Sequence, residues 1–287
     1  MDNFAAIKPV FRGKMGGKTN FPPMDFFQNK RIWITGASSG IGEALAIEAA
    51  KRGAQLILSA RKEAELHRVA ALCVGAPSVM IEPLDLSKHD EIAQIVQNLL
   101  KKVGKIDILI NNGGISQRSL AVETSLEVDK QMMAVNYLGT VALTKAVLPS
   151  MRLHRLGHIA TVTSLMGKFG APMRSSYAAS KHALHGFFDS LRAELGDEPI
   201  KITLICPGFV RTNISINALT ATGQKQGTMD DATEKGLSPE DCARGILKAI
   251  EKGKAEAYLG GREVLGVYLK RFFPKYLNKI VKKAKTT

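Results

Sequence analysis

Cysteine, proline and long apolar runs are all scarce in this sequence. The three cysteines, Cys73, Cys206 and Cys242, are widely separated and have neither C-x-x-C spacing nor histidine pairs beside them. That pattern predicts a reducing compartment and no metal site. Only 11 of the 287 residues are proline, and no apolar run approaches the roughly 18 residues of a membrane-spanning helix. The composition therefore excludes collagen, a disordered chain and a polytopic membrane protein.

Positive charge is concentrated at the two ends of the chain. Of the net charge of +14, residues 1–23 carry +3 and residues 268–287 carry +7, which leaves +4 for the part between them. The basic ends contain no nucleic-acid recognition motif, so we expect no nucleic-acid partner. The remainder has the charge of an ordinary cytosolic protein, and we expect a cytoplasmic location.

From residue 30 onward, short apolar segments alternate with longer segments of helical periodicity. The strand-like segments span Ile32–Thr35, Gln55–Ser59, Val79–Glu82, Ile106–Ile110, His158–Thr163 and Ile200–Ile205. The helical segments span Ile41–Arg52, Glu63–Leu72, Asp90–Val103, Glu127–Leu153 and Ser176–Leu195. Such alternation forms βαβ units with right-handed crossovers. The sequence therefore predicts an α/β fold with one doubly wound parallel sheet in three α/β/α layers.

The composition along the chain predicts a single domain with two extensions. Residues 1–23 contain several glycines and prolines and no secretory signal, so we expect a flexible leader, with Met24 as an alternative start. Residues 24–262 form the domain, and residues 263–287 form a basic amphipathic extension. Within the domain, residues 213–238 have the small and polar composition of a mobile lid. Four apolar lid residues are placed to close over an apolar substrate: Ile214, Ile216, Leu219 and Met229.

A glycine-rich loop follows the first strand directly. It runs Thr35-Gly36-Ala37-Ser38-Ser39-Gly40-Ile41-Gly42, and the next helix begins inside it. Glycine lets the backbone approach a pyrophosphate, whose charge is attracted by the N–H groups and the positive dipole end of the helix. The position between a strand and a helix favours a dinucleotide site over a plain turn. The predicted contacts are Gly36, Ser38, Ser39, Gly40, Ile41 and Gly42.

The end of the second strand bears on the choice of cofactor. A site that prefers NAD places an acidic residue there to hold the ribose 2′-hydroxyl, but this sequence reads Ser59-Ala60-Arg61-Lys62. The planar guanidinium of Arg61 can pair with a 2′-phosphate, which favours NADP (NADPH) over NAD. Alternatively, Arg61 and Lys62 only begin an exposed helix, and Ser39 supplies no second cation.

Tyr177 and Lys181 are four residues apart in a helical segment, so their side chains share one face. A phenol is a poor base near neutral pH, and a nearby ammonium group lowers its pKa toward the working range. Ser164 follows the fifth predicted strand, at the strand end where α/β sheets bind ligands. A hydroxyl there can donate to a carbonyl oxygen.

The glycine-rich loop, Ser164, and the Tyr177–Lys181 pair occur in the same order as in the short-chain dehydrogenase/reductase family. The resemblance to that family spans about residues 29–260 and implies a Rossmann fold. The resemblance assigns Tyr177 as general acid/base, Lys181 as binder of the nicotinamide ribose, and Ser164 as hydrogen-bond donor to the substrate oxygen. It also assigns Asn136 to a water relay, although a helix-interior asparagine ordinarily bonds its own backbone. Further cofactor contacts implied by the resemblance are Asp85, Leu86, Asn112, Gly113, Tyr177, Lys181, Pro207, Gly208, Val210 and Thr212.

Two positions depart from the family pattern. Gly113 replaces the commoner alanine of the Asn-Asn-Ala-Gly motif, and Ser39 stands where many NADP-dependent members have a basic residue. The first departure adds backbone freedom without removing a functional group. The second weakens the expectation of NADP and leaves the reaction class unchanged.

We therefore expect an NADP-preferring oxidoreductase that transfers hydride between nicotinamide and a secondary alcohol or ketone of an apolar substrate. It is expected to form a homo-oligomer, either a dimer or a tetramer. The alternative is a catalytically silent dinucleotide-binding redox sensor. The joint presence of Ser164, Tyr177 and Lys181 argues against a sensor, which needs only the phosphate loop. Substrate identity and the favoured direction stay open.

Apolar residues recur with a period of about four near the C-terminus, opposite several lysines. They are Val264, Leu265, Tyr268, Leu269, Phe272, Phe273, Tyr276, Leu277, Ile280 and Val281. A strip of this kind over residues 264–285 can lie on the inner face of an anionic membrane as a peripheral contact. It can equally pack on its own domain or on a sister subunit. Pro274 is expected to interrupt the helix.

Overall fold

The computed structural model of this protein describes residues 25–283. Within them, seven parallel strands form one sheet in the order β3-β2-β1-β4-β5-β6-β7. The strands are β1 Arg31–Thr35, β2 Gln55–Ser59, β3 Val79–Ile81, β4 Ile108–Asn111, β5 Gly157–Val162, β6 Ile200–Pro207 and β7 Glu256–Leu259. The predicted doubly wound parallel sheet is confirmed, and the leader and Met24 lie outside the described residues.

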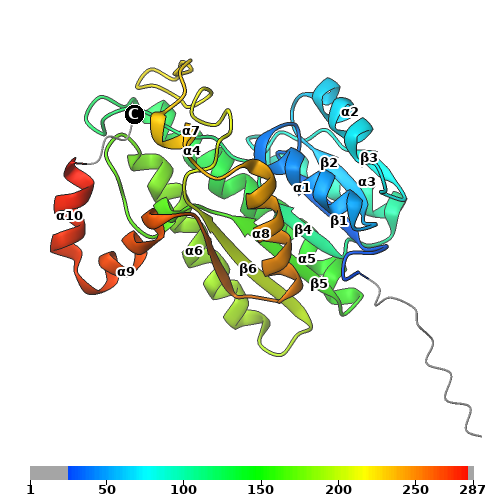
Figure 1. The fold of residues 1–287 in the computed structure, drawn as a ribbon. Helices are drawn as coiled ribbons and strands as arrows, with labels where there is room; N and C mark the ends of the chain where they lie inside the picture. The colour runs from blue at the N-terminus through cyan, green and yellow to red at the C-terminus, as the bar shows by residue number, and fades with distance from the viewer. Residues whose placement is uncertain (1–24, 284–287) are drawn as a thin grey trace, which may run out of the picture.

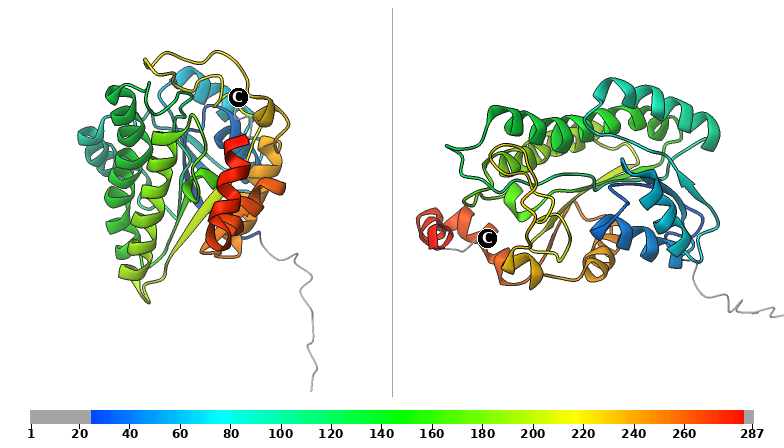
Figure 2. Two further views of the ribbon diagram at one scale, coloured as in Figure 1. Left: turned by 90° about the vertical axis from the view of Figure 1, so that its left-hand side faces the viewer. Right: turned by 90° about the horizontal axis from the view of Figure 1, so that it is seen from above.

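Helices cover both faces of the sheet, which gives three layers (Figures 1 and 2). The helices are α1 Gly40–Lys51, α2 Glu63–Leu72, α3 His89–Val103, α4 Leu126–Met133, α5 Thr140–Leu153, α6 Ser175–Leu195, α7 Asp231–Glu234, α8 Pro239–Glu251, α9 Leu265–Phe272 and α10 Pro274–Lys283. Strand β1 shows why the strands are apolar throughout. Ile32 and Ile34 pack in the cluster with α1 and α8, whereas Trp33 packs in the opposite cluster with α3, α5 and α6. Both faces of each central strand are thus buried.

The expected continuous helix Glu127–Leu153 is wrong. A π-helical segment, Ala134–Gly139, separates α4 from α5. Gly139 passes so close to the backbone of Leu86 that a Cβ atom there would lie 2.2 Å from the Leu86 carbonyl oxygen. The periodicity of apolar residues predicts a helix over this stretch. It does not distinguish an α-helical turn from the wider π-helical turn that is found beside Leu86 and that carries Asn136.

Two elements near the C-terminus were not among the predicted ones. Strand β7 is a four-residue edge strand that begins with a glutamate, so its apolar pattern is too short to detect. Helix α8 has a local sequence signal at its start. The Ser238 side chain accepts a hydrogen bond from the N–H of Asp241, and Pro239 opens the helix.

The C-terminal strip divides between two surfaces. As expected, the helix breaks at Pro274, and α9 and α10 result. Leu277 and part of the strip pack against Leu165 and Phe169 of the domain. The outer side is exposed and contains Leu265, Tyr268, Phe272, Phe273, Tyr276 and Ile280. None of the described helices is long and apolar enough to span a membrane.

Candidate active site

Strand order reverses between β1 and β4, so the loops that leave these two strands lie side by side at the carboxyl edge of the sheet. Thr35, the last residue of β1, braces them. Its hydroxyl oxygen accepts from the N–H groups of Asn112 at 3.0 Å and Gly113 at 2.9 Å. In return the Asn112 amide donates to the Thr35 carbonyl oxygen at 3.0 Å. The Asn112–Gly113 segment is thereby the wall of the glycine loop.

The glycine loop has the shape that a pyrophosphate needs. Gly36 has a φ of 64°, in the left-handed region that favours glycine. A Cβ atom on Gly42 would lie 2.1 Å from the Gly36 carbonyl oxygen, so this turn excludes a side chain. Ser39 precedes α1 with an extended backbone and makes no side-chain cap, which leaves the first N–H groups of the helix without that partner. The residues therefore fit an anionic dinucleotide at the N-terminus of α1.

The segments that follow β2 and β3 bring a cation and an anion together. Arg61 is exposed just after β2, and its charge reaches Asp85. Burial raises the pKa of Asp85, but hydrogen bonds from Ser87 and the charges of Arg61 and Lys88 outweigh burial and hold the pKa below its usual range. Asp85 is thus an anion beside the loop. Leu86 reaches Gly113, where a Cβ atom would lie 2.8 Å from Leu86 Cδ1, the end of a side chain that can move.

Asn136 lies in the π-helical segment and does not bond its own helix. Its amide oxygen accepts from the N–H of Ile115 at 2.8 Å, and its amide nitrogen donates to the Ile115 carbonyl oxygen at 3.0 Å and to Ser180 Oγ at 3.0 Å. The alternative of a local backbone bond is therefore wrong. Asn136 joins the strand end after β4 to α6, the helix that carries Tyr177.

Ser164, Tyr177 and Lys181 come together at the carboxyl end of β5. The Ser164 side chain is close enough to Tyr177 to lower the pKa of that phenol. The Lys181 ammonium donates to the Val162 carbonyl oxygen at 3.0 Å and lies 5.8 Å from the centroid of the Tyr177 ring. The four-residue spacing predicted that Tyr177 and Lys181 share one helix face, and both residues lie on one face of α6.

Burial governs the pKa values of these two groups. It raises the pKa of Tyr177, and the hydrogen bond with Ser164 and the charges of Arg174 and Arg118 lower it only in part. The pKa therefore lies above its ordinary value, opposite to the direction expected from Lys181. Burial also lowers the pKa of Lys181 to about 8. The phenol is thus held in its protonated form at neutral pH.

The segment after β6 returns to the glycine loop. Pro207 ends the strand, and the Gly208 N–H donates to the Leu259 carbonyl oxygen at 2.7 Å. Val210 is buried, and Thr212 approaches Gly40 so closely that a Cβ atom on that glycine would lie 2.9 Å from Thr212 Cγ2. The segment predicted to hold the nicotinamide is therefore adjacent to the loop predicted to hold the pyrophosphate.

Sequence reasoning missed the residues between β4 and α4. Ser116, Gln117, Arg118 and Ser119 are consecutive, polar and buried. Arg118 forms an ion pair with Asp230 of the segment expected to be a lid, and Leu219 of that segment packs against Tyr177. The signal in the sequence was four polar residues in a row, separated from the Asn-Asn-Gly-Gly motif only by Ile115.

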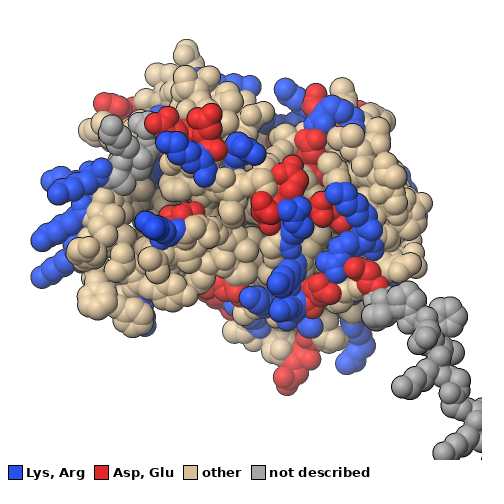
Figure 3. All heavy atoms as spheres, in the orientation of Figure 1, with Lys and Arg blue, Asp and Glu red and all other residues tan. Residues whose placement is uncertain are grey.

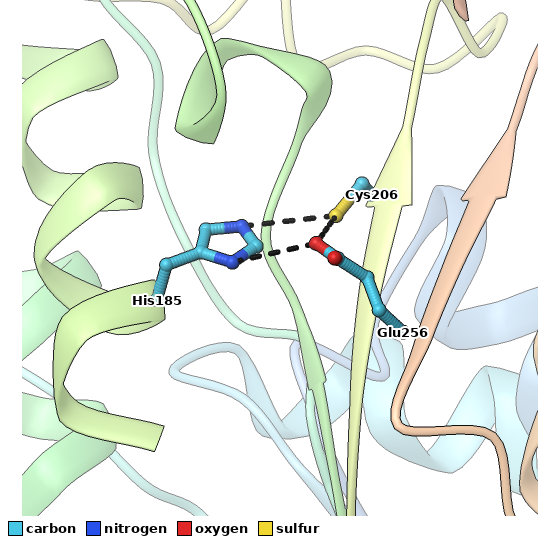
Figure 4. Close-up of side chains that lie close together, drawn as sticks. All are labelled: His185, Cys206 and Glu256. Carbon is cyan, nitrogen blue, oxygen red and sulfur yellow. Dashed lines mark hydrogen bonds and ion pairs between the residues drawn. The ribbon is translucent and has the colours of Figure 1, made fainter. Parts of the chain in front are cut away.

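Behind the catalytic edge, the fold also assembles His185, Cys206 and Glu256 (Figure 4). The His185 Nδ1 lies 3.5 Å from Glu256 Oε1, because β6, β7 and α6 meet here. The Lys168 ammonium lies 2.6 Å from the same carboxylate oxygen. That carboxylate thus already has a cationic partner. The cluster connects β7 to Thr163, whose hydroxyl lies 3.1 Å from His185 Nε2.

Comparison with known proteins agrees with this geometry. Residues 30–222 match the family model described as short chain dehydrogenase. The chain is 49% identical over 236 residues to a dehydrogenase/reductase SDR family protein 7-like from Anopheles gambiae, which covers 80% of this chain and 74% of that protein. The chain therefore belongs to the short-chain dehydrogenase/reductase family, and it is an NAD(P)-dependent oxidoreductase.

Two solved structures share the fold. A short-chain dehydrogenase/reductase from Burkholderia phymatum, in complex with NAD, has a TM-score of 0.77 at 24% identity over 91% of this chain and 97% of that one. An alcohol dehydrogenase from Thermococcus sibiricus, complexed with 5-hydroxy-NADP, has a TM-score of 0.69 at 26% identity over 82% of this chain and 97% of that one. A nicotinamide dinucleotide is therefore the cofactor of this class of fold and site.

Proposed function

We propose that this protein is an NADP-preferring carbonyl reductase or alcohol dehydrogenase that acts on a ketone or secondary alcohol of an apolar substrate. The observation that carries the proposal is that Ser164, at the end of β5, lowers the pKa of the Tyr177 phenol, with the Lys181 ammonium on the next turn of α6. Four further residues would hold the cofactor at the loop and its wall: Gly36, Gly42, Asn112 and Thr212. When bound, the nicotinamide supplies or accepts the hydride.

The chain's own residues supply proton transfer and orientation. Ser164 donates a hydrogen bond to the substrate oxygen, and Tyr177 gives that oxygen its proton during reduction or takes it during oxidation. Lys181 holds the nicotinamide ribose and offsets the charge of the phenolate. Asn136, bonded to Ile115, supports the route by which a proton reaches Lys181 from solvent. Val128, Met132 and Leu219 pack beside Tyr177, which favours an apolar substrate.

Arg61 supports the preference for NADP. It is the exposed cation at the end of β2, where an NAD-preferring member would have a carboxylate. Arg68 lies nearby, with Nη2 3.3 Å from the Ser38 carbonyl oxygen, but its guanidinium is paired with Glu43 at 2.8 Å. Arg61 is therefore the cation that we assign to the 2′-phosphate. We further propose a homo-oligomer in the cytoplasm.

The outer face of α9 and α10 supports a second part of the proposal, peripheral contact with the inner face of an anionic membrane. Phe272, Phe273 and Tyr276 are all more than half exposed, and no acidic residue follows Glu263. Lys and Arg side chains gather at the edge that α10 forms (Figure 3). Apolar groups inserted between headgroups, with lysines beside them, fit an anionic lipid surface.

A screen with purified protein tests the catalytic proposal. Acetophenone, 2-decanone and cyclohexanone are offered with NADPH or NADH, and nicotinamide absorbance is followed. The corresponding alcohols are offered with NADP⁺ or NAD⁺. We expect turnover with at least one ketone and a higher kcat/KM with NADPH than with NADH. Binding of NADPH without turnover on any carbonyl or alcohol would instead support the redox sensor.

A further inference from the structure

Four consecutive polar residues are buried beside the active site. Ser116, Gln117, Arg118 and Ser119 each expose 4% of their surface or less. A buried polar group without a partner is strongly unfavourable, so the partners of these residues show what the segment is built to hold. Apart from bonds within the segment and bonds to Thr124 and Met173, those partners come from the first turn of α6 and from the 213–238 segment.

Gln117 holds the first turn of the catalytic helix. Its amide oxygen accepts from the N–H groups of Ser176 at 2.9 Å and Tyr177 at 3.3 Å, and its amide nitrogen donates to Ser175 Oγ at 3.2 Å. Arg174, the residue that precedes the helix, makes no side-chain cap. The Gln117 amide thus satisfies N–H groups at the helix start that a capping side chain would otherwise satisfy. The position of Tyr177 therefore depends on the 116–119 segment.

Arg118 ties the same segment to residues 213–238. Its Nε donates to Asp230 Oδ2 at 2.9 Å, and its Nη1 donates to Ser116 Oγ and to the Gln117 carbonyl oxygen, both at 2.7 Å. The side chains of Arg118 and Asp230 expose 2% and 0% of their surface. Two backbone hydrogen bonds also join the two segments. The Leu219 carbonyl oxygen accepts from the Arg118 N–H at 2.8 Å, and the Leu219 N–H donates to the Ser116 carbonyl oxygen at 2.8 Å.

The Arg118–Asp230 ion pair is also part of the charge environment of the Tyr177 phenol. Asp230 Oδ2 lies 3.3 Å from Nη2 of Arg174, which stands at the start of α6. The positive charges of Arg174 and Arg118 both act on Tyr177. Lys181 faces the Tyr177 ring from the same helix, α6. Asp129 of α4 accepts a hydrogen bond from the Ser176 hydroxyl at the start of α6. Asp230 therefore offsets part of the positive charge that surrounds Tyr177.

We propose that Arg118 and Asp230 are a positioning pair for the reaction, which holds residues 213–238 against the catalytic helix and keeps a fixed positive charge beside Tyr177. Neither residue touches the reacting atoms in this assignment. Both act through Tyr177 and the packed segment, including Leu219. The proposal rests on the proposed function only where it makes Tyr177 the acid/base.

The pH profile of alcohol oxidation distinguishes this role from a purely structural one. Oxidation needs the phenolate, so its rate rises as the pH passes the pKa of Tyr177. Arg118→Gln removes a positive charge, which disfavours the phenolate, and should move the midpoint upward by roughly one pH unit. Asp230→Asn removes the compensating negative charge and should move it downward. Arg118→Lys keeps the charge and should keep the midpoint, even if its rate is lower.

The assay uses 1-phenylethanol, 2-decanol and cyclohexanol with NADP⁺, and thermal melts check that each variant is folded. Asp231→Asn is the matched control, because Asp231 is the exposed neighbour of Asp230. Midpoints that move in opposite directions for Arg118→Gln and Asp230→Asn support the proposal. Equal midpoints with lower rates overturn it. If Arg118→Gln does not fold, the midpoint of Asp230→Asn against that of Asp231→Asn decides.

Limited trypsin digestion tests the anchoring without a substrate. Lys225 and Lys235 lie within the 213–238 segment and are sites for trypsin. Asp230→Asn and Arg118→Gln should be cut there several-fold faster than the wild type, whereas Asp231→Asn should not. Equal cleavage in all four proteins would overturn the anchoring. A wild type inactive on every alcohol and ketone would refute the proposed function instead, and the digestion result would still stand.

Discussion

The Lys181 ammonium donates to the Val162 carbonyl oxygen at 3.0 Å, at the end of the strand that leads to Ser164. It is therefore directed at the strand end, and it lies 5.8 Å from the centroid of the Tyr177 ring. Burial is the dominant influence on the pKa of Tyr177, and it favours the protonated phenol. The protonated phenol is the form that the proposed reduction of a carbonyl requires.

Removing the Tyr177 hydroxyl should abolish most of the activity. Tyr177→Phe keeps the ring that packs against Leu219 but has no proton to give, so kcat for ketone reduction should fall by at least roughly 100-fold. NADPH affinity, measured by calorimetry, should change little. Tyr137→Phe, a partly buried tyrosine that packs against Phe187, serves as the control and should keep its turnover. Near-normal turnover in Tyr177→Phe would remove this residue from the mechanism.

Cofactor preference should reverse when a carboxylate is placed at the end of β2. Ala60→Asp sets a negative charge against the 2′-phosphate and offers NADH a partner for its ribose hydroxyl. We expect NADPH affinity to fall by about tenfold or more, because like charges in such contacts cost several kcal/mol. Arg61→Ser should weaken NADPH alone, and Lys62→Ala should affect neither cofactor. A wild type that binds NADH more tightly than NADPH would contradict the assignment of Arg61.

Membrane contact is tested on the exposed face only, because truncation would also remove Leu277 from the core. The triple variant Phe272→Gln, Phe273→Gln, Tyr276→Gln leaves the packed side intact. With vesicles of phosphatidylserine and phosphatidylcholine, the wild type should co-sediment, and binding should weaken with salt, since each lysine near the surface contributes about 1 kcal/mol. The variant should stay in the supernatant.

Leu153→Gln is the matched control, because Leu153 is 81% exposed but lies elsewhere on the molecule. It should bind vesicles as the wild type does. A wild type that stays in the supernatant with anionic vesicles refutes the membrane proposal. If such a protein is also larger in solution than the triple variant, the face is a contact between subunits.

Acid should destabilise the fold through His158. Burial lowers the pKa of His158 to about 4, below its usual 6.5, so the folded protein favours the neutral ring. The stability from this residue is therefore complete above pH 6.5 and is lost as the pH falls toward 4, and at pH 5 the loss is about 2 kcal/mol. Between pH 7 and 5, urea unfolding of the wild type should weaken more than that of His158→Gln. Exposed His154→Gln should follow the wild type.

Local features of the site were predictable because each is encoded by neighbouring residues. The glycine loop needs only the order of residues 35–42 between a strand and a helix, and the shared face of Tyr177 and Lys181 needs only helical spacing. The position of Asn136 is a different case. It was found through family resemblance, since periodicity alone predicted a regular helix there and a local hydrogen bond. Its actual partner, Ile115, is 21 residues away.

The sequence by itself determined the layered α/β fold and the family, since strand and helix periodicities and the spacing of motifs depend on residues close together in the chain. Only the tertiary structure decided which distant groups meet. Arg118 and Asp230 are 112 residues apart, and no local pattern distinguishes a buried ion pair from two surface charges. Likewise the C-terminal strip has one periodicity, but packing against Phe169 decided which of its residues are buried and which remain exposed.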